Sequence, residues 1–300
     1  MKKHFLDYID HAQSRSARGL RILVEYFFAL EQLEPVRLSG IHIVSVFGSA
    51  RVDSQSSEYL EAKKLGRLLY ENGFGVITGG SHGIMEAANA GAEEGIVEAY
   101  RVKHHHLTEE QIKKTKEYQR KLKMYSIGLQ ITLPFEQEVN PFVGVMATFH
   151  YFMIRKFFFA TLSSAFIACE GGWGTRDEFF EILTLVQTGK APLMPIIYVT
   201  PHPQHLQADI DYSVKHGYIS KDDRTLLDIV PNHKRAVEIV KKFYRYVRSI
   251  SYGKEPHVQI FLRRPLSATQ KKKITQLVNE RYADLFAGGV KFLSDRFELR

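Results

Sequence analysis

The chain has 300 residues, of which 44% are hydrophobic and 25% are charged. This composition is typical of a globular protein with one large domain or two modest ones. Lysine and arginine exceed aspartate and glutamate by 41 − 33 = 8, which is compatible with a phosphorylated ligand, an acidic partner or nucleic acid. No apolar run approaches the ~20 residues that span a bilayer. The single cysteine, Cys169, excludes an intramolecular disulfide.

Both ends of the chain contain basic residues, and each end could be a targeting or binding segment. The first four residues, Met1-Lys2-Lys3-His4, lead into a polar amphipathic pattern and not into the apolar part of a signal peptide. We therefore expect a cytoplasmic protein with no membrane partner. Positive charge is concentrated between Lys254 and Arg300, but no RNA- or DNA-binding motif accompanies it. We interpret this stretch as a solvated basic surface, and a nucleic-acid partner is not expected.

The predicted elements alternate between helix and strand. Apolar residues at helical spacing between Phe5 and Leu33 predict one packing helix that ends before Pro35. Further along, short apolar runs predict strands at 41–47, 75–78, 127–133, 165–169 and 194–199. Helical periodicity predicts helices at 58–72, 84–94, 149–162 and 177–187. This alternation predicts an α/β fold, with a Rossmann-like doubly wound parallel sheet covered by helices on both faces.

The last part of the chain predicts a small α+β extension. Residues 236–247 predict a helix, and 258–262, 267–285 and 290–293 predict a strand, a helix and a strand. We thus divide the chain into an N-terminal helical segment (1–38), a Rossmann-like domain (39–250) and a C-terminal extension (251–300).

A glycine-rich turn carries the most specific signal. Its sequence is Cys169-Glu170-Gly171-Gly172-Trp173-Gly174-Thr175-Arg176-Asp177-Glu178, between a predicted strand and a predicted helix. The glycines let backbone N–H groups approach an anion, and the start of a helix adds unpaired N–H groups and a positive dipole end. This is typical of a phosphate site, with Glu178 reaching the sugar or base beyond it. The structural alternative is a capping box of Thr175 and Glu178, which needs no ligand.

Five motifs make the chain resemble the LOG (Lonely Guy) family, whose characterised members are nucleotide 5′-monophosphate phosphoribohydrolases. They occur in the family's order at residues 47–51, 78–89, 126–141, 151–156 and 171–178. The resemblance implies a Rossmann-like fold and a homodimer with the site near the subunit interface. It also implies hydrolysis of the N-glycosidic bond of a nucleoside 5′-monophosphate, AMP- or GMP-like or a cytokinin riboside monophosphate, to free base and ribose 5-phosphate. Neither a cofactor nor a metal is expected.

The same resemblance assigns residues to roles. The catalytic arginine falls on Arg155 and the catalytic glutamate on Glu178. Breaking the C1′–N bond builds positive charge on the ribose, and the attacking water needs a base, so a carboxylate suits both tasks. Arg155 would hold the phosphate or orient that carboxylate; the alternative is an ion pair that only ties two helices together. The implied substrate- and phosphate-binding residues are Gly48, Ser49, Gly79, Gly80, Gln137, Lys156, Gly171, Gly172, Gly174, Thr175 and Thr184.

The chain departs from the family pattern at three single positions and in one segment. Glu170 replaces a proline and Trp173 a smaller side chain, which could alter base specificity, and His82 places an imidazole near the phosphate region. Residues 96–125 look like an insertion, rich in charge and carrying the adjacent histidines 104–106. Three adjacent histidines cannot face one point in a regular element, so we expect no metal there. We expect a solvated helix or an active-site lid with little apolar surface to bury.

Two other functions compete with this hypothesis. A non-catalytic nucleotide or molybdenum-cofactor carrier could use the same fold, because function lies in the site and not in the architecture. The presence of both Arg155 and Glu178 favours the enzyme. A lysine decarboxylase, the activity in an older name of the family, would need pyridoxal phosphate on a Schiff-base lysine, and a phosphate turn is not evidence of one.

Overall fold

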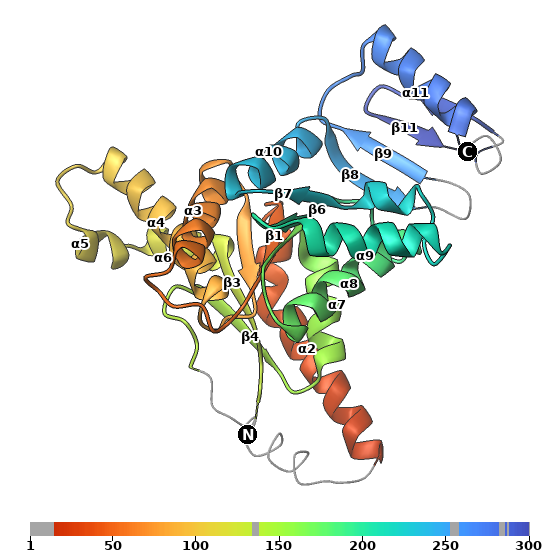
Figure 1. Cartoon of the computed structure of the whole chain (residues 1–300). Helices are drawn as coiled ribbons and strands as arrows, with labels where there is room; N and C mark the ends of the chain where they lie inside the picture. The colour runs from red at the N-terminus through yellow and green to blue at the C-terminus, as the bar shows by residue number, and fades with distance from the viewer. Residues whose placement is uncertain (1–14, 134–137, 253–257, 282–285, 287, 300) are drawn as a thin grey trace.

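The chain folds around two β-sheets (Figure 1). The computed structural model describes residues 15–133, 138–252, 258–281, 286 and 288–299. The larger sheet has seven parallel strands in the order β4-β3-β2-β1-β5-β6-β7. Its strands are β1 Ile43–Phe47, β2 Gly75–Thr78, β3 Ser126–Ile131, β4 Val145–Phe149, β5 Ser163–Cys169, β6 Ile196–Val199 and β7 Asp228–Val230. The chain moves outward from β1 to β4 and then returns to β5 on the other side of β1, so the strand order reverses between β1 and β5.

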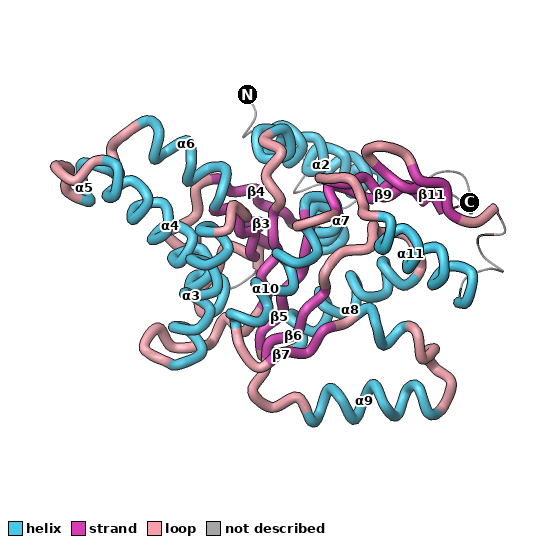
Figure 2. The backbone as a smooth tube through the Cα atoms, turned by 90° about the horizontal axis from the view of Figure 1, so that it is seen from above, coloured by secondary structure: helices cyan, strands magenta, loops and turns pink. Residues whose placement is uncertain are grey.

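Helices cover both faces of this sheet (Figure 2). On one face lie α2 Arg15–Leu38, α7 Phe152–Leu162 and α8 Trp173–Gln187, and their buried Leu33, Phe158 and Phe179 belong to one apolar cluster. On the other face lie α3 Ser57–Glu71, α4 Ile84–Lys103 and α10 His233–Tyr244, which share a second apolar cluster. Since apolar helices pack on both faces, β1 and β2 are buried along their whole length. The predicted doubly wound α/β fold is confirmed.

The N-terminal helix does not end before Pro35, as the sequence had suggested. Helix α2 continues to Leu38 with Pro35 in its last turn. Leu33 and Val36, which flank the proline region, are only 1% and 2% exposed. Burial of this last turn against the sheet therefore outweighs the backbone hydrogen bond that a proline removes.

One strand was missed where a helix was predicted from residue 149. Phe149 ends β4, and α7 begins only at Phe152. In β4 the side chains of Ala147 and Phe149 are buried while Thr148 is exposed, which is the alternation of a strand and not of a helix. Helix α9 Gln204–Lys215, the 3-10 turn Asp223–Leu226 and β7 were also not predicted.

Residues 96–125 form part of a packed layer. Helix α4 continues to Lys103, and α5 Glu109–Lys113 and α6 Lys116–Tyr125 then lead into β3. Threonine caps explain both short helices, because Thr108 forms a capping box and Thr115 accepts from the N–H of Tyr118. A third apolar cluster comprises Ile96, Val97, Tyr100, Ile112, Tyr118 and Leu122. The expectation of little buried apolar surface is therefore wrong. Figures 1 and 2 also show α5 on the side of the molecule away from α7 and α8.

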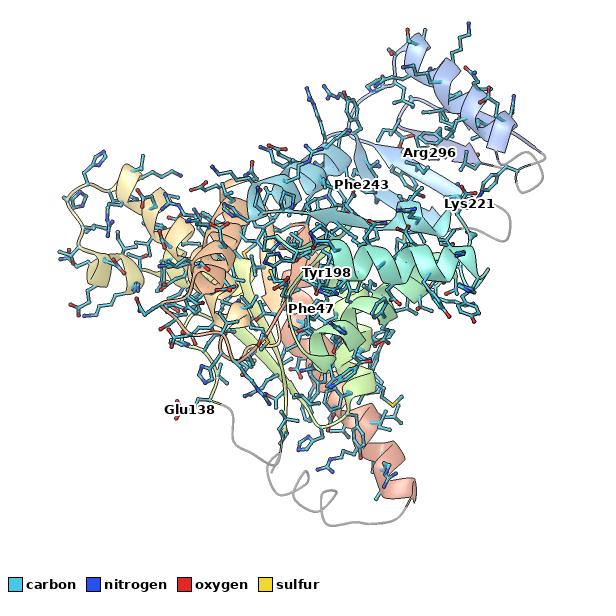
Figure 3. All side chains as sticks on the ribbon, viewed as in Figure 1. Phe47, Glu138, Tyr198, Lys221, Phe243 and Arg296 are labelled. Carbon is cyan, nitrogen blue, oxygen red and sulfur yellow. The ribbon has the colours of Figure 1, made fainter. Side chains whose placement is uncertain are left out.

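The smaller sheet is antiparallel, in the order β10-β11-β9-β8. Its elements are β8 Val247–Tyr252, β9 Val258–Leu262, α11 Ala268–Arg281, β10 Val290–Phe292 and β11 Arg296–Leu299. The predicted strand, helix and strand correspond to β9, α11 and β10, and β8 and β11 complete the sheet. Figure 3 shows Phe47 and Tyr198 among the strands and helices of the larger sheet, and Arg296 on the smaller sheet.

Candidate active site

The glycine-rich turn joins β5 to α8 at the carboxyl edge of the larger sheet. Gly172 is the N-cap of α8 in extended conformation, and no side chain caps this helix. Thr175 and Glu178 lie inside the helix, so the capping box that the sequence allowed is not formed. No other atoms lie within 4 Å of where side chains would start at Gly172 and Gly174. The start of α8 is therefore open to an anion, as a phosphate site requires.

Gly171 holds this turn against the turn that follows β1. A Cβ at Gly171 would lie 2.2 Å from Thr175 Oγ1 and 3.1 Å from the backbone nitrogen of Ser49. The same nitrogen donates to the carbonyl oxygen of Glu170 at 3.2 Å, and the carbonyl of Ser49 accepts from the N–H of Ile84 at 3.1 Å. The structure thus brings together Ser49, Gly171 and Thr175 where the strand order reverses, and Gly48 precedes Ser49 in the same turn. Ligands of doubly wound folds bind at such a point.

The turn after β2 contains two more of the predicted glycines, Gly79 and Gly80. Gly80 has a positive φ of +70°, and its N–H donates to Thr78 Oγ1 at 3.0 Å. A Cβ at Gly79 would lie 3.9 Å from Nη1 of Arg155. The predicted residues Gly79 and Arg155 are therefore neighbours.

Arg155 and Glu178 form a buried ion pair. Nη2 of Arg155 donates to Oε1 of Glu178 at 3.1 Å, and only 12% and 7% of their side chains are exposed. The guanidinium also lies 5.0 Å from the ring centre of Phe152. Burial raises the pKa of Glu178 above its ordinary value, although the charge of Arg155 opposes this shift. Burial lowers the pKa of Arg155.

One donor of Arg155 has no acceptor. Within the described residues, the buried Nε of Arg155 makes no hydrogen bond. A buried donor without a partner is costly, so an acceptor that enters the site would be favoured at this position. A phosphate or ribose oxygen is such an acceptor.

Other predicted residues lie elsewhere on α7 and α8. Nζ of Lys156 is paired with Asp177 at 2.8 Å and with Glu181 at 2.6 Å. The hydroxyl of Thr184 donates to the carbonyl of Phe180 at 2.8 Å, within its own helix. Lys156 and Thr184 line an open depression beside Trp173, and neither Arg155 nor Glu178 lines it. Gln137 lies outside the described residues.

The three departures from the family pattern have distinct surroundings. Glu170 accepts a hydrogen bond from the hydroxyl of Thr200. His82 Nδ1 lies 3.0 Å from Glu86 Oε2 on the exposed start of α4. Trp173 is 87% exposed and lines the depression that Lys156 and Thr184 also line.

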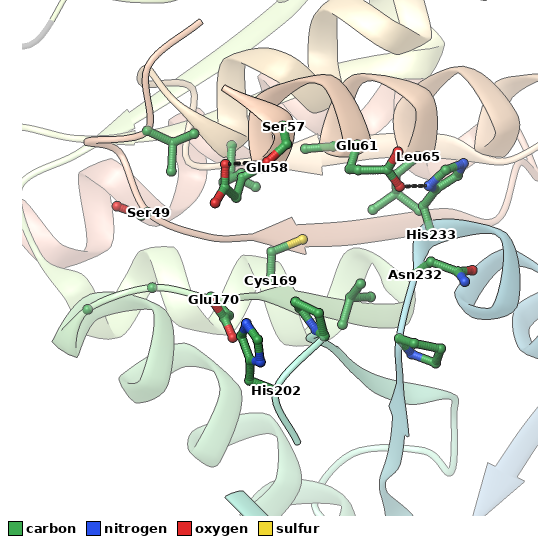
Figure 4. A pocket seen from close by; sticks show the side chains of 18 residues that line it. Ser49, Ser57, Glu58, Glu61, Leu65, Cys169, Glu170, His202, Asn232 and His233 are labelled. Carbon is green, nitrogen blue, oxygen red and sulfur yellow. Dashed lines mark hydrogen bonds and ion pairs between the residues drawn. The ribbon is translucent and has the colours of Figure 1, made fainter. Parts of the chain in front are cut away.

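Sequence reasoning missed a cavity of about 540 Å³ beside the glycine turn (Figure 4). Ser49, Gly171 and Gly172 line it, together with His202 and Asn232 from the turns after β6 and β7. These positions follow directly from the carboxyl ends of two parallel strands. Prediction of β7 from its short apolar run would have pointed to Asn232.

Two features are absent from the described residues. These residues contain no group of three histidine, cysteine, aspartate or glutamate side chains placed to hold a metal ion. Nor does any helix among them have the length and apolarity to cross a membrane.

The parallel sheet, the open glycine turn and the buried pair at its carboxyl edge define a Rossmann-like α/β protein with a candidate nucleotide site. Comparison with protein families agrees with this class. The model described as "Possible lysine decarboxylase" matches residues 85–240, and that of the "SLOG cluster4 family" matches residues 41–99. The chain belongs to the LOG family.

Curated relatives match the chain over a shorter stretch. "Cytokinin riboside 5'-monophosphate phosphoribohydrolase LOG1" of Arabidopsis thaliana is 36% identical over 94 residues, which are 31% of this chain and 43% of the relative. The enzyme of the same description named LOG, from Oryza sativa subsp. japonica, is 34% identical over 101 residues, 33% of this chain and 40% of the relative. The chain thus spans less than half the length of these relatives.

Two solved structures match about two thirds of the chain at low identity. A molybdenum cofactor binding protein from Rippkaea orientalis is 18% identical with a TM-score of 0.45, covering 68% of this chain and 97% of its own. A molybdenum cofactor carrier protein from Chlamydomonas reinhardtii is 19% identical with a TM-score of 0.44, covering 67% of this chain and 97% of its own.

Proposed function

We propose that this protein hydrolyses the N-glycosidic bond of nucleoside 5′-monophosphates and releases the free base and ribose 5-phosphate. The observation that carries the proposal is the buried pair of Arg155 and Glu178, which lies against Gly79 and one helical turn from Thr175. Family membership and the relatives' names support the same reaction.

The glycine turns would hold the phosphate. The N–H groups at the start of α8 are uncapped, and Gly172 and Gly174 leave room for an anion. The Nε of Arg155, which has no acceptor among the described residues, adds a charged donor, and Nη1 of the same guanidinium lies close to Gly79. Charge-assisted hydrogen bonds of this kind are stronger than neutral ones, so a nucleoside without the phosphate should be a poor substrate.

Glu178 would act at C1′. Its carboxylate can stabilise the positive charge that develops on the ribose as the C1′–N bond breaks, and it can take a proton from the attacking water. A buried carboxylate with a raised pKa is a stronger base than an exposed one. Arg155 would position this carboxylate through the 3.1 Å hydrogen bond. No step requires a cofactor or a metal.

We also propose that the enzyme is a homodimer. Neighbouring helices α2, α7 and α8 expose large apolar side chains, and helix faces of this kind are typical of subunit interfaces. The exposed fractions are 63% for Phe27, 64% for Met153, 46% for Phe157, 87% for Trp173 and 41% for Phe180.

Release of ribose 5-phosphate tests the reaction. Purified protein is incubated with AMP, GMP, CMP, UMP, a cytokinin riboside monophosphate and adenosine, and Glu178→Gln serves as the matched variant. We expect turnover of at least one monophosphate, little turnover of adenosine, and loss of turnover in the variant with nucleotide binding retained. Binding of nucleotides without any turnover would support a carrier instead.

A further inference from the structure

The turn after β2 consists of residues that do not fix its shape by themselves. Gly79 and Gly80 follow Thr78, the last residue of β2, and glycine has more backbone freedom to lose on folding than any other residue. Gly80 has a φ of +70°, which other residues rarely adopt. The hydroxyl of Ser81 is buried and has no hydrogen-bond partner among the described residues. The shape of this turn therefore depends on neighbouring elements.

Two buried side chains hold the turn from the interior of the protein. The N–H of Gly80 donates to Oγ1 of Thr78 at 3.0 Å. The backbone N–H of Asn140 donates to the carbonyl of Gly80 at 3.0 Å, and its Nδ2 donates to the carbonyl of Ser81 at 3.1 Å. Thr78 and Asn140 are 0% and 1% exposed, so these three backbone groups of the turn are bonded to the interior.

Asn89 of α4 links the two side chains. Its Oδ1 accepts from Oγ1 of Thr78 at 2.6 Å and from Nδ2 of Asn140 at 3.2 Å. Its Nδ2 donates to Oγ of Ser126, at the start of β3, at 2.9 Å. The hydroxyl of Ser126 donates to the carbonyl of Phe142 at 2.7 Å, and the N–H of Phe142 donates to Oδ1 of Asn140 at 3.2 Å. A buried network whose members pair with one another in this way specifies one arrangement of the elements that it joins.

The other side of the turn adjoins the candidate catalytic pair. A Cβ at Gly79 would lie 3.9 Å from Nη1 of Arg155, the cation of that pair. The carbonyls of Gly80 and Ser81 accept from Asn140, so their partial negative charges do not oppose an anion beside the guanidinium. A turn that is already held in this conformation binds an anion without the cost of ordering a flexible segment.

We propose that Thr78 and Asn140 are positioning residues for the 5′-phosphate: they hold residues 79–81 in the conformation that accepts it, and so set the preference for a monophosphate over a nucleoside. The proposal rests on the proposed function, because it takes the phosphate to bind at the glycine turns. Neither side chain would touch the substrate, since both are buried beneath the turn. Without them, phosphate binding would have to order the turn, whereas binding of the base and ribose would not.

A matched pair of substitutions at Thr78 tests the proposal. Thr78→Val keeps the branched shape and loses the hydroxyl, whereas Thr78→Ser keeps the hydroxyl and loses a methyl group. Dissociation constants of AMP, ribose 5-phosphate and adenosine are measured by calorimetry on the full chain. We expect Thr78→Val to weaken AMP and ribose 5-phosphate roughly tenfold and to leave adenosine unchanged. Thr78→Ser should bind all three as the wild type does.

A second variant tests the other side chain. Asn140→Ala should also weaken AMP roughly tenfold, because the carbonyl of Ser81 loses its donor. Asn72→Ala is the matched control, since Nδ2 of Asn72 also donates to a backbone carbonyl, that of Leu68 at 2.7 Å, but at the end of α3, just before β2 and thus at the opposite edge of the sheet. Its affinity for AMP should be unchanged. Circular dichroism and thermal denaturation show which variants fold, and the pair at Thr78 decides the question if Asn140→Ala does not.

Three outcomes would overturn the proposal. Thr78→Val could weaken AMP and adenosine by the same factor, Thr78→Ser could behave like Thr78→Val, or the wild type could bind AMP no tighter than adenosine. The first two would mean that the network only stabilises the core. Because the measurement is binding, a wild type that binds AMP without hydrolysing it contradicts the proposed function and leaves this test intact. Unchanged AMP affinity in a Thr78→Val variant of an active hydrolase refutes the positioning role alone.

Discussion

At the scale of single residues, the ionisation of Glu178 should set the acidic limit of activity. Burial raises the pKa of this carboxyl above the ordinary 4.5, and the base must be ionised to accept a proton. We therefore expect kcat/KM to fall as the pH drops through a midpoint above 4.5. In Arg155→Met the opposing positive charge is absent, so the pKa rises further and the midpoint of the residual activity moves to higher pH.

A pH series of kcat/KM for the wild type and both arginine variants measures this shift. Arg155→Lys keeps the charge and should keep the midpoint near that of the wild type. If Arg155→Met and the wild type share one midpoint, another group sets the limit.

Close packing at Gly171 gives a second prediction at this scale. In Gly171→Ala the new methyl group would meet Thr175 Oγ1 and the backbone of Ser49, so the two turns must separate. We expect a loss of about 1–3 kcal/mol in the free energy of unfolding, measured by urea denaturation. Gly174→Ala is the control. Its methyl group meets no atom within 4 Å and lies inside α8, where alanine should stabilise by up to ~1 kcal/mol.

Sequence reasoning brought Arg155 and Glu178 together, but it did not predict every side-chain direction. The resemblance to the family assigned Gly79, Arg155 and Glu178 to one site, and in the structure they are neighbours. Lys156 follows Arg155 directly, yet successive residues of a helix point about 100° apart. It therefore pairs with Asp177 and Glu181, partners that a motif read as a linear string does not reveal.

At the scale of elements, the N-terminal helix should contribute to stability. Leu33 of α2 is 1% exposed in the central apolar cluster. Leu33→Ala should lower the free energy of unfolding by about 2–5 kcal/mol, the usual cost of truncating a buried leucine and leaving a cavity. Leu60→Ala, at a position on α3 that is 48% exposed and lies outside the proposed interface, should change it little. Stability is measured by thermal and urea denaturation. If the two variants lower it equally, α2 is not docked on the sheet as described.

The segment from α4 to α6 should also behave as part of the core. Ile112 is fully buried among Tyr100, Tyr118 and Leu122. We expect Ile112→Ala to lower the free energy of unfolding by about 2–5 kcal/mol, and Lys114→Ala, whose side chain is 74% exposed, to have little effect. If Ile112→Ala has the stability of the wild type, the segment is an insertion with little buried apolar surface after all.

Helices and strands were predicted well where the spacing of their apolar residues was regular. The buried strands β1 and β2 and the helices α3 and α8 follow from apolar runs and helical spacing. Residues 96–125 misled because lysine, arginine and glutamate together are slightly more frequent there than apolar residues, and the six buried side chains come from three separate helices. Such a cluster has no signature within any one helix, since each contributes only one to three of its members.

At the scale of the whole molecule, the exposed apolar side chains of α2, α7 and α8 should mediate dimerisation. We expect the wild type to have twice the chain mass in size-exclusion chromatography with light scattering. Met153→Lys should give the monomer mass, because Met153 is 64% exposed on α7 and a buried, unpaired lysine is costly at an interface. Leu60→Lys is the matched control, since Leu60 is 48% exposed on α3, on the opposite face of the sheet.

Met153 precedes Arg155 by half a turn of α7, so the loss of the dimer should also reduce turnover. A wild type that is monomeric at micromolar concentration, or a dimer dissociated by Leu60→Lys and not by Met153→Lys, would contradict this interface.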